Sequence, residues 1–198
     1  MASLATGSLE VLAVPDFKEG MQYRCLLIVR ADAGINELSG LRGRAFAFTD
    51  PESNTGCFVP KWLLKERGFN PETHFSRVVF TKSHDRSIHA VADGIIDGAG
   101  VDSLIYYSLI KSDPALKDKI RIIWQSEAFG APPVVAPTGL REETKDKLKA
   151  ILFSMPQDPR GREILDGLDI EHFRAPDPNE YDSAYRIWKA IHVEKEAG

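Results

Sequence analysis

The sequence predicts an α/β fold with a doubly wound sheet, because short apolar runs of strand length alternate with segments of helical periodicity. Turn residues, mostly Asp, Asn, Gly and Pro, separate the two kinds of segment. The 198 residues are 43% hydrophobic and 27% charged, which is enough apolar material for a buried core. Strands separated by helices of about ten residues favour right-handed βαβ units, and therefore a parallel sheet with helices on both faces.

The expected elements alternate regularly over the first two thirds of the chain. We expect strands at 23–30, 44–48, 77–80, 98–101 and 120–125. Between them we expect helices at 57–67, 85–93 and 104–111. A glycine or an Asp-Pro pair follows each of these helices, as is typical of helix ends.

Beyond residue 125, apolar stripes at helical spacing dominate. A short strand is expected to end at Ala136, and helices are expected at 140–155, 161–166 and 181–191. The first helix has an apolar face made by Leu148, Ile151, Leu152 and Met155. The last has one made by Tyr181, Ala184, Tyr185, Trp188 and Ile191. Residues 9–30 and 127–198 supply little strand for these faces to cover.

Segment 49–56 is predicted to form a tight turn and the start of a helix. Ser53, Asn54 and Thr55 are residue types that occupy N-cap positions, and Gly56 lets another group approach the backbone closely. The first N–H groups of a helix have no intrahelical partner and lie at the positive end of the helix dipole. The segment therefore predicts an oxyanion site. The alternative is that these residues cap the helix and bind nothing.

Two further polar residues follow neighbouring strands, His84 after 77–80 and Asp102 after 98–101. Ligands of open α/β sheets bind at the carboxyl ends of the strands, so we expect both residues beside segment 49–56. His84 could donate to an oxyanion, and Asp102 could accept from a protonated one. Alternatively, His84 is a solvated residue at a helix start and Asp102 is an N-cap, a role compatible with ligand contact.

Composition excludes several classes of function. The formal net charge of −4 and the lack of a Lys/Arg cluster argue against a nucleic-acid surface. No apolar run approaches the roughly 18 residues that span a bilayer, and no signal peptide is recognisable. Residues 1–8 are interpreted as a leader. The two cysteines, Cys25 and Cys57, have no metal-binding spacing, so neither a metal nor another cofactor is expected.

From about Tyr23 to the last helix, the sequence resembles the phosphate/phosphite/phosphonate-binding proteins of ABC transporters, a branch of the type II periplasmic binding proteins. The stretches that carry the resemblance are YRCLLIVR, LRGRAFAFTDPESNTGCFVP, SRVVFTKSHDRSIHAVADGIIDGAGVDS and IIWQSEAFGAPPVV. The resemblance implies that the ligand's oxyanion sits on Ser53, Asn54, Thr55 and Gly56, with His84 beside it. The family more often has Thr and Ser at the second and third of these positions, and both changes keep hydrogen-bonding capacity.

The resemblance also implies a two-lobed molecule. Residues 38–125 are expected to form the complete α/β lobe two, which carries the anion site. Residues 9–37 and 126–198 are expected to form hinge crossings and a partial lobe one, because the family's first strands and helices have no counterpart here. We therefore expect the helix faces of the partial lobe and the free edge of strand 23–30 to promote self-association.

The expected function is capture of a small oxyanion by the extracytoplasmic solute-binding component of an ABC transporter, not catalysis. The resemblance implies that family members which bind aminoalkylphosphonates hold the ammonium group with acidic side chains at two positions. These positions fall on Leu104 and near Pro132 here, and neither is acidic. We therefore expect phosphate, phosphite or a small alkylphosphonate as the ligand. The resemblance implies a transporter permease as the partner and a periplasmic or cell-surface location.

The sequence leaves two other functions open. The first is a ligand-sensing domain of the same fold that reports to a kinase or another partner through its last helix. The second, which is disfavoured, is a hydrolase with His84 as base, Asp102, and a hydroxyl of Ser53 or Thr55. Neither hydroxyl lies in a nucleophile-elbow pattern.

Overall fold

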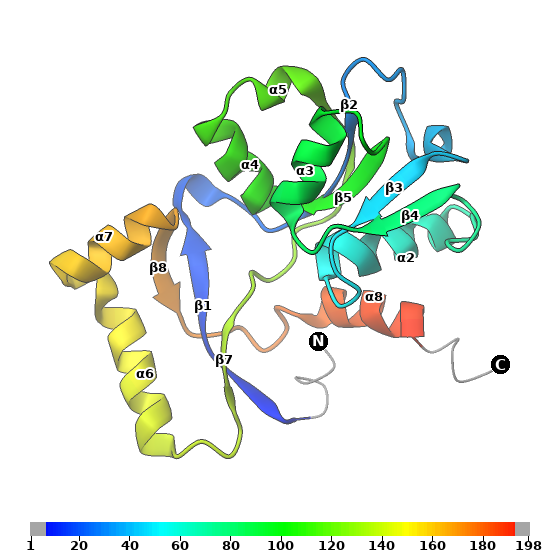
Figure 1. Cartoon of the computed structure of the whole chain (residues 1–198). Helices are drawn as coiled ribbons and strands as arrows, with labels where there is room; N and C mark the ends of the chain where they lie inside the picture. The colour runs from blue at the N-terminus through cyan, green and yellow to red at the C-terminus, as the bar shows by residue number, and fades with distance from the viewer. Residues whose placement is uncertain (1–6, 193–198) are drawn as a thin grey trace. The chain divides into compact units, whose positions relative to one another are not determined.

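The computed structural model describes residues 7–192, and the chain divides into two compact units (Figure 1). Unit 1 comprises Met1–Gln22 and Phe129–Tyr185, and unit 2 comprises Tyr23–Ala128 and Arg186–Gly198. The residues expected to form the complete lobe, 38–125, thus fall within unit 2, together with the strand that precedes them. The leader expected at 1–8 lies outside the described residues except for its last two.

Unit 2 is built on a five-stranded sheet with the order β4-β3-β5-β2-β6. The strands are β2 (Cys25–Arg30), β3 (Ala45–Phe48), β4 (Arg77–Phe80), β5 (Gly98–Asp102) and β6 (Ile120–Gln125). β3 is parallel to both β4 and β5, as the alternation of strands and helices predicted. The carboxyl ends of these three strands therefore share one edge of the sheet.

β2 departs from the prediction of a parallel sheet, because it is antiparallel to β5 on one side and to β6 on the other. Only the short 3₁₀ helix η2 (Leu38–Leu41) lies between β2 and β3, which is too little for the crossover that a parallel βαβ unit requires. The prediction that strand 23–30 has a free edge is also wrong, since residue Leu26 pairs with Val101 and with Gln125.

Helices cover both faces of this sheet, as predicted. α3 (His84–Ala92), α4 (Ser103–Ser112) and the unpredicted α5 (Leu116–Lys119) pack on one face, and α2 (Val59–Glu66) lies on the other (Figure 1). Leu26, Ile28 and Val101 point to the first face and form one core with Ile88 and other side chains of these helices. The opposite face carries stacked rings from β3 and the loop before β4, such as Phe46 and Phe75, whose centroids are 4.3 Å apart.

Unit 1 contains a three-stranded antiparallel sheet of order β7-β1-β8. Its strands are β1 (Leu9–Phe17), β7 (Val134–Pro137) and β8 (Ile170–Arg174). Only β7 was predicted. β1 contains Pro15 and a register irregularity, and β8 is short and polar, so neither has a clear local pattern. The expectation of little strand in this part of the chain is wrong, because β1 pairs with β7 through its first half and with β8 through its second half.

The helices of unit 1 follow the predicted stripes with shifted ends. They are α6 (Glu142–Ser154), the 3₁₀ helix η4 (Met155–Gln157), α7 (Pro159–Gly167) and the start of α8 (Asp182–His192), whose last residues belong to unit 2. A buried lysine, Lys145 of α6, links this helix to β1 by donating to Glu10 at 2.7 Å, and it also donates to Glu142 of its own helix at 2.8 Å. Within the described residues, no helix combines the length and apolar character of a membrane span.

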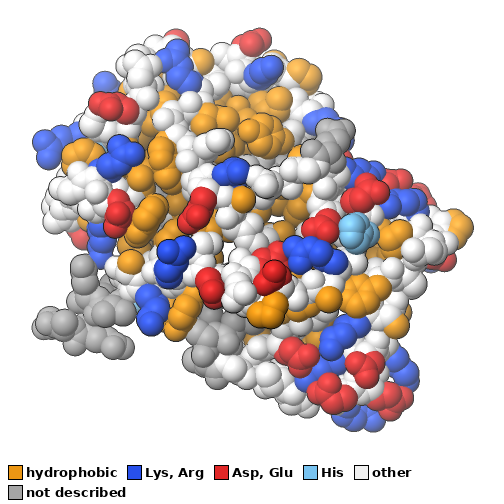
Figure 2. Space-filling view, turned by 180° about the vertical axis from the view of Figure 1, so that it is seen from behind, with side chains coloured by type: hydrophobic (Ala, Val, Ile, Leu, Met, Phe, Trp, Pro, Cys, Tyr) orange, Lys and Arg blue, Asp and Glu red, His pale blue; other side chains and the backbone are white. Residues whose placement is uncertain are grey.

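Acidic and basic side chains are interspersed with apolar ones on the face shown in Figure 2. This mixed distribution agrees with the lack of a Lys/Arg cluster in the sequence.

Candidate functional site

The predicted helix start (Ser53–Gly56) exists, and it begins with a wide turn. Residues Asn54–Phe58 form a π-helical turn, η3, that runs into α2 at Val59, so the helix begins three residues earlier than predicted. Ser53 is its N-cap, and the Ser53 hydroxyl oxygen accepts from the backbone N–H of Gly56 at 3.0 Å. The N–H groups of Cys57 and Phe58 both donate to the Ser53 carbonyl, which leaves the first turn broad.

Gly56 is required by a close approach of the helix start to the end of β3. A β-carbon at this position would lie 1.7 Å from the Thr49 hydroxyl oxygen and 2.9 Å from that of Ser53. Gly100 of β5 has the same role on the other side, where a β-carbon would lie 2.4 Å from the Pro60 ring. The two glycines allow the helix start to lie directly on the carboxyl ends of β3 and β5.

Several polar groups at the helix start are buried without a partner in the described part of the chain. These are the Thr49 hydroxyl and both polar atoms of the Asn54 amide, which form no hydrogen bond of normal geometry although the amide is near enough to the Tyr23 phenol to lower its pKa. The backbone N–H groups of Asn54 and Thr55 also donate to no described residue. An unmet buried polar group costs about 1–3 kcal/mol, so this helix start carries hydrogen-bonding capacity that the described residues do not satisfy.

Tyr23 and Cys25 hold Thr55 from the side of β2. The Tyr23 phenol donates to the Thr55 hydroxyl oxygen over 3.4 Å, and the Cys25 thiol donates to the Thr55 carbonyl over 3.0 Å. Thr55 itself is fully buried. Burial raises the pKa of Tyr23, and the Asp102 carboxylate raises it further, so the phenol is a neutral donor at this edge.

The loop after β4 is tied to the end of β3 by Lys82. This residue has a φ of 72°, which is uncommon for a non-glycine residue, and its backbone N–H donates to the Thr49 carbonyl at 2.8 Å. The left-handed turn at Lys82 directs the chain into α3, so that His84 is the first residue of that helix. The predicted helix start at Asp85 is therefore correct to within one residue.

His84 and Asp102 are in direct contact. The backbone N–H of Asp102 donates to Nδ1 of His84 at 3.0 Å, and the Asp102 carboxylate accepts from the backbone N–H of Leu104 at 2.7 Å. Asp102 is therefore the N-cap of α4, which confirms one of the two roles weighed from the sequence. In the sheet, Asp102 of β5 pairs with Cys25 of β2. Cys25 lies two residues after Tyr23 in the chain.

Burial shifts both of these side chains away from the charged form. It raises the pKa of Asp102 from 3.8 to about 6, although the N–H groups of Leu104 and Ile105 oppose the shift. Burial also lowers the pKa of His84 from 6.5 to about 4, and the charge of Asp85 counteracts this only in part. At neutral pH the site therefore combines a neutral imidazole with a carboxylate whose charged form is disfavoured by burial.

Hydrogen bonds involve five of the six residues that the sequence singled out, in three separate pairs, and the side chain of the sixth, Asn54, forms none within the described residues. Ser53 and Gly56 bond to each other, Thr55 is linked to Tyr23, and Asp102 is linked to His84. Sequence reasoning missed Tyr23 and Thr49 as parts of the site. Tyr23 could have been noticed as a polar-tipped aromatic residue heading an apolar strand, whereas Thr49 has no local signal.

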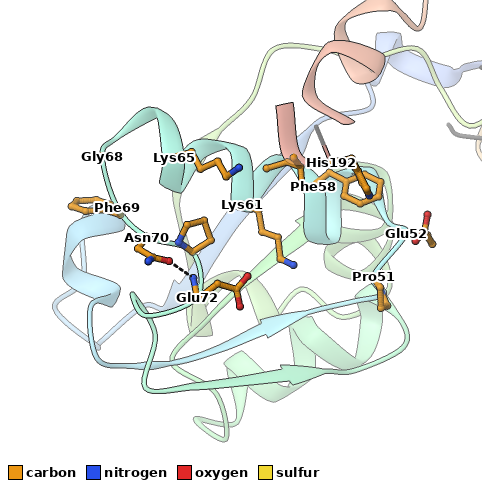
Figure 3. A pocket seen from close by; sticks show the side chains of 12 residues that line it. Pro51, Glu52, Phe58, Lys61, Lys65, Gly68, Phe69, Asn70, Glu72 and His192 are labelled. Carbon is orange, nitrogen blue, oxygen red and sulfur yellow. Dashed lines mark hydrogen bonds between the residues drawn. The ribbon is translucent and has the colours of Figure 1, made fainter. Parts of the chain in front are cut away.

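A hollow in unit 2 is a different feature (Figure 3). It has a volume of about 720 Å³ and lies along α2, with Lys61 and Lys65 on its wall and His192 at its rim. Its lining residues include two carboxylates, Glu52 and Glu72, and Glu72 and Lys61 point toward one another in Figure 3. None of the six predicted site residues lines it, and it is not the predicted oxyanion site.

The mixed sheet of unit 2, with its polar edge at the ends of β3, β4 and β5, has the fold of the type II periplasmic binding proteins. A binding protein component of an ABC phosphonate transporter from Pseudomonas aeruginosa superposes with a TM-score of 0.85 at 23% identity, covering 94% of this chain and 63% of that one. Residues 2–181 match the model of a family described as the ABC transporter, phosphonate, periplasmic substrate-binding protein. The chain belongs to this family, and the resemblance seen in the sequence is confirmed.

Two curated relatives agree with this assignment. The phosphonates-binding periplasmic protein of Escherichia coli (strain K12) is 29% identical over 157 residues, which cover 77% of this chain and 46% of the relative. A probable ABC transporter phosphite binding protein, PhnD1, of Prochlorococcus marinus (strain MIT 9301) is 21% identical over 96% of this chain and 67% of the relative. The structure of that PhnD1 in complex with methylphosphonate has a TM-score of 0.81, at 21% identity over 96% of this chain and 74% of that one.

This chain therefore spans about half the length of the first curated relative. The family is one of periplasmic substrate-binding proteins and not of enzymes, as expected from the sequence.

Proposed function

We propose that this chain is part of the solute-binding component of an ABC transporter and that it captures a small phosphorus oxyanion at the helix start (Ser53–Gly56). The observation that carries the proposal is the group of buried polar atoms without partners there, above all the Asn54 amide. A tetrahedral anion offers several acceptor oxygens at once, and it would satisfy these donors in one step.

The donors available at the helix start suit an oxyanion. The Ser53 oxygen already accepts from Gly56, so its hydroxyl hydrogen is available to a ligand. The N–H groups of Asn54 and Thr55 lie at the positive end of the helix dipole, and Nε2 of His84 has no partner among the described residues. Asp102 is the one acidic side chain in this set, and its raised pKa eases contact with a ligand that retains a proton.

The ligand is proposed to lack an amine. Leu104, the second residue of α4, is apolar, and by the resemblance it occupies one of two positions, the other near Pro132, whose carboxylates would neutralise an ammonium group. The names of the relatives point to the same class of ligand, since they are described as binding phosphonates, phosphite and methylphosphonate. Phosphate, phosphite and small alkylphosphonates therefore form the proposed set.

Delivery to a membrane permease and a periplasmic or cell-surface location are proposed from the family alone. A sensing role would use the same site, and the neighbouring genes would separate it from transport.

A ligand panel on the whole chain tests the proposal. Thermal unfolding would be followed with phosphate, phosphite, methylphosphonate, aminoethylphosphonate and sulfate. A ligand held only by the folded state stabilises it by RT ln(1 + [L]/Kd), about 2.7 kcal/mol at a hundredfold excess over Kd. We expect methylphosphonate or phosphite to give the largest shift and aminoethylphosphonate a smaller one.

Two substitutions locate the binding. Ser53→Ala and Thr55→Ala should each weaken binding of the best ligand by about 1.5–3 kcal/mol, the range for hydrogen bonds to charged groups. Thr55→Ser keeps the hydroxyl and is the matched control, together with the exposed Ser112→Ala. Unchanged affinity in both alanine variants, measured by calorimetry, would place the anion elsewhere. Tighter binding of the aminated ligand would refute the argument from Leu104.

A further inference from the structure

The direction of one hydrogen bond fixes the protonation of His84. The backbone N–H of Asp102 lies 3.0 Å from Nδ1 of His84 and can only donate. Nδ1 must therefore offer a lone pair and cannot carry a proton. A neutral imidazole has a single N–H, which must then be on Nε2. The tautomer follows from the chemical identity of the donor and not from a placed hydrogen.

The sheet explains why a side chain is needed at this place. Asp102 is the last residue of β5, and the N–H of the next residue bonds toward β2. Successive N–H groups of a strand alternate in direction, so the Asp102 N–H points toward the β3 side. β3 has already diverged there, since its last pair with β5 is Ala47↔Ala99. Nδ1 of His84 therefore accepts the hydrogen bond from the Asp102 N–H that the carbonyl of a neighbouring strand would otherwise have accepted.

The surroundings of His84 keep its ring neutral. Protonation of Nδ1 would set two N–H groups against each other and would place a charge in a buried position, and burial lowers the pKa of His84 to about 4. The charged group that acts on it is Asp85 on its own helix. Asp102, whose backbone holds the ring, also carries a carboxylate, and the Tyr23 phenol interacts with that carboxylate. Nε2 has no partner among the described residues, so its N–H remains available.

We propose that the Asp102 backbone N–H holds His84 as a neutral imidazole whose Nε2–H only donates, and that this donor selects an unprotonated oxygen of the bound anion. The second half of this inference rests on the proposed function, whereas the tautomer is a property of the ligand-free protein. Asp102 acts on His84 as a positioning residue through its backbone. The contribution of His84 to binding is therefore a directed hydrogen bond and not a positive charge.

Nitrogen NMR of the ligand-free chain tests the tautomer without any ligand. The His84 signals are assigned by their loss in His84→Asn. Between about pH 5.5 and 8, where a free histidine would titrate, we expect the ¹⁵N–¹H correlations of an Nε2–H imidazole and no change of form. An Nδ1–H pattern, or an imidazolium at about pH 6, would overturn the inference.

A pair of isosteric variants tests the donor. The amide nitrogen of Gln reaches the position of Nε2, whereas the Asn side chain reaches only that of Nδ1. His84→Gln should therefore bind methylphosphonate about tenfold or more tightly than His84→Asn, as expected for one hydrogen bond to a charged group. Thermal unfolding of both variants confirms that the fold is retained.

The matched control is the same pair of changes at His89, which is exposed on the same helix and should show no difference. Equal affinity of His84→Gln and His84→Asn would refute the selection of an unprotonated oxygen. If the unmodified protein binds none of the panel ligands, the proposed function and that selection both fail, and the NMR experiment still decides the tautomer.

Discussion

Asp102 stabilises the site through its backbone and destabilises it through its ionised carboxylate. The backbone N–H holds His84, while the side chain caps α4 and is only 8% exposed. A carboxyl whose pKa is raised by folding binds its proton more tightly in the folded state than in the unfolded one. The stability that it contributes is present below the unfolded pKa and is lost as the pH rises through the folded pKa.

Asp102→Asn should reveal this dependence. Asn caps a helix as well as Asp does, so the fold should be retained. With a pKa that moves from 3.8 to about 6, the unmodified protein should lose stability relative to Asp102→Asn between pH 4 and 8, by up to about 3 kcal/mol. Denaturant unfolding at several pH values measures the difference.

The control for this prediction is Asp113→Asn, an exposed carboxylate that accepts from the N–H two residues ahead in the same way as Asp102. The unfolding free energies of Asp102→Asn and the unmodified protein should differ by an amount that changes over this pH range. A constant difference would contradict the proposed cost of burying the ionised Asp102 carboxylate. The lowered pKa of His84 acts in the opposite direction, because it removes stability as the pH falls from 6.5 towards 4, but it does so in both proteins.

At the scale of elements, the helix start depends on glycines that allow close contact with the sheet. Gly56→Ala should destabilise unit 2 by roughly 1–3 kcal/mol or more, because the added methyl group would overlap the Thr49 hydroxyl. Gly139→Ala is the control, since a β-carbon at residue 139 meets no atom within 4 Å. An equal effect of the two substitutions on unfolding would show that the close approach is not required.

A double-mutant cycle identifies the cause of the loss. Thr49→Ala removes an oxygen that is buried without a described partner, so by itself it should cost little in the absence of ligand. In combination with Gly56→Ala it should recover part of the lost stability, which would appear as a coupling energy of about 0.5–3 kcal/mol.

At the scale of the whole molecule, exposed apolar side chains of unit 1 remain as the basis for the predicted self-association. On α6, Ile151 is 61% exposed, and Leu168, just after α7, is 57% exposed. We expect concentration-dependent association in light scattering, because such side chains on one unit favour an interface. Ile151→Lys should weaken it, whereas Ile95→Lys, at a similarly exposed position of unit 2, should not.

A monodisperse monomer at every concentration would refute this prediction. The other basis that the sequence suggested, a free edge at strand 23–30, does not exist, because β2 is paired along both sides.

Local chemistry by itself determined the elements that carry the site. The runs 77–80 and 120–125 match β4 and β6 residue for residue, since both are apolar segments bounded by turn residues. The N-cap type at Asp102 located the start of α4 to within one residue, because capping is a contact within three residues. Ser53 is also an N-cap, but the helix after it begins three residues earlier than predicted. The expectation that three parallel strands bring their polar ends together also needed only the order of elements.

Only the tertiary structure decided what depends on partners distant in the sequence. β1 and β8 exist because each completes a ladder with residues more than a hundred positions away, and their own sequences have weak strand patterns. Three other features also depend on such distant partners. They are the antiparallel pairing of β2, the close contact of Gly56 with Thr49 and the hydrogen bond that fixes the His84 tautomer. Hydrophobic periodicity records which face of a segment is buried, but it does not record which segment lies against it.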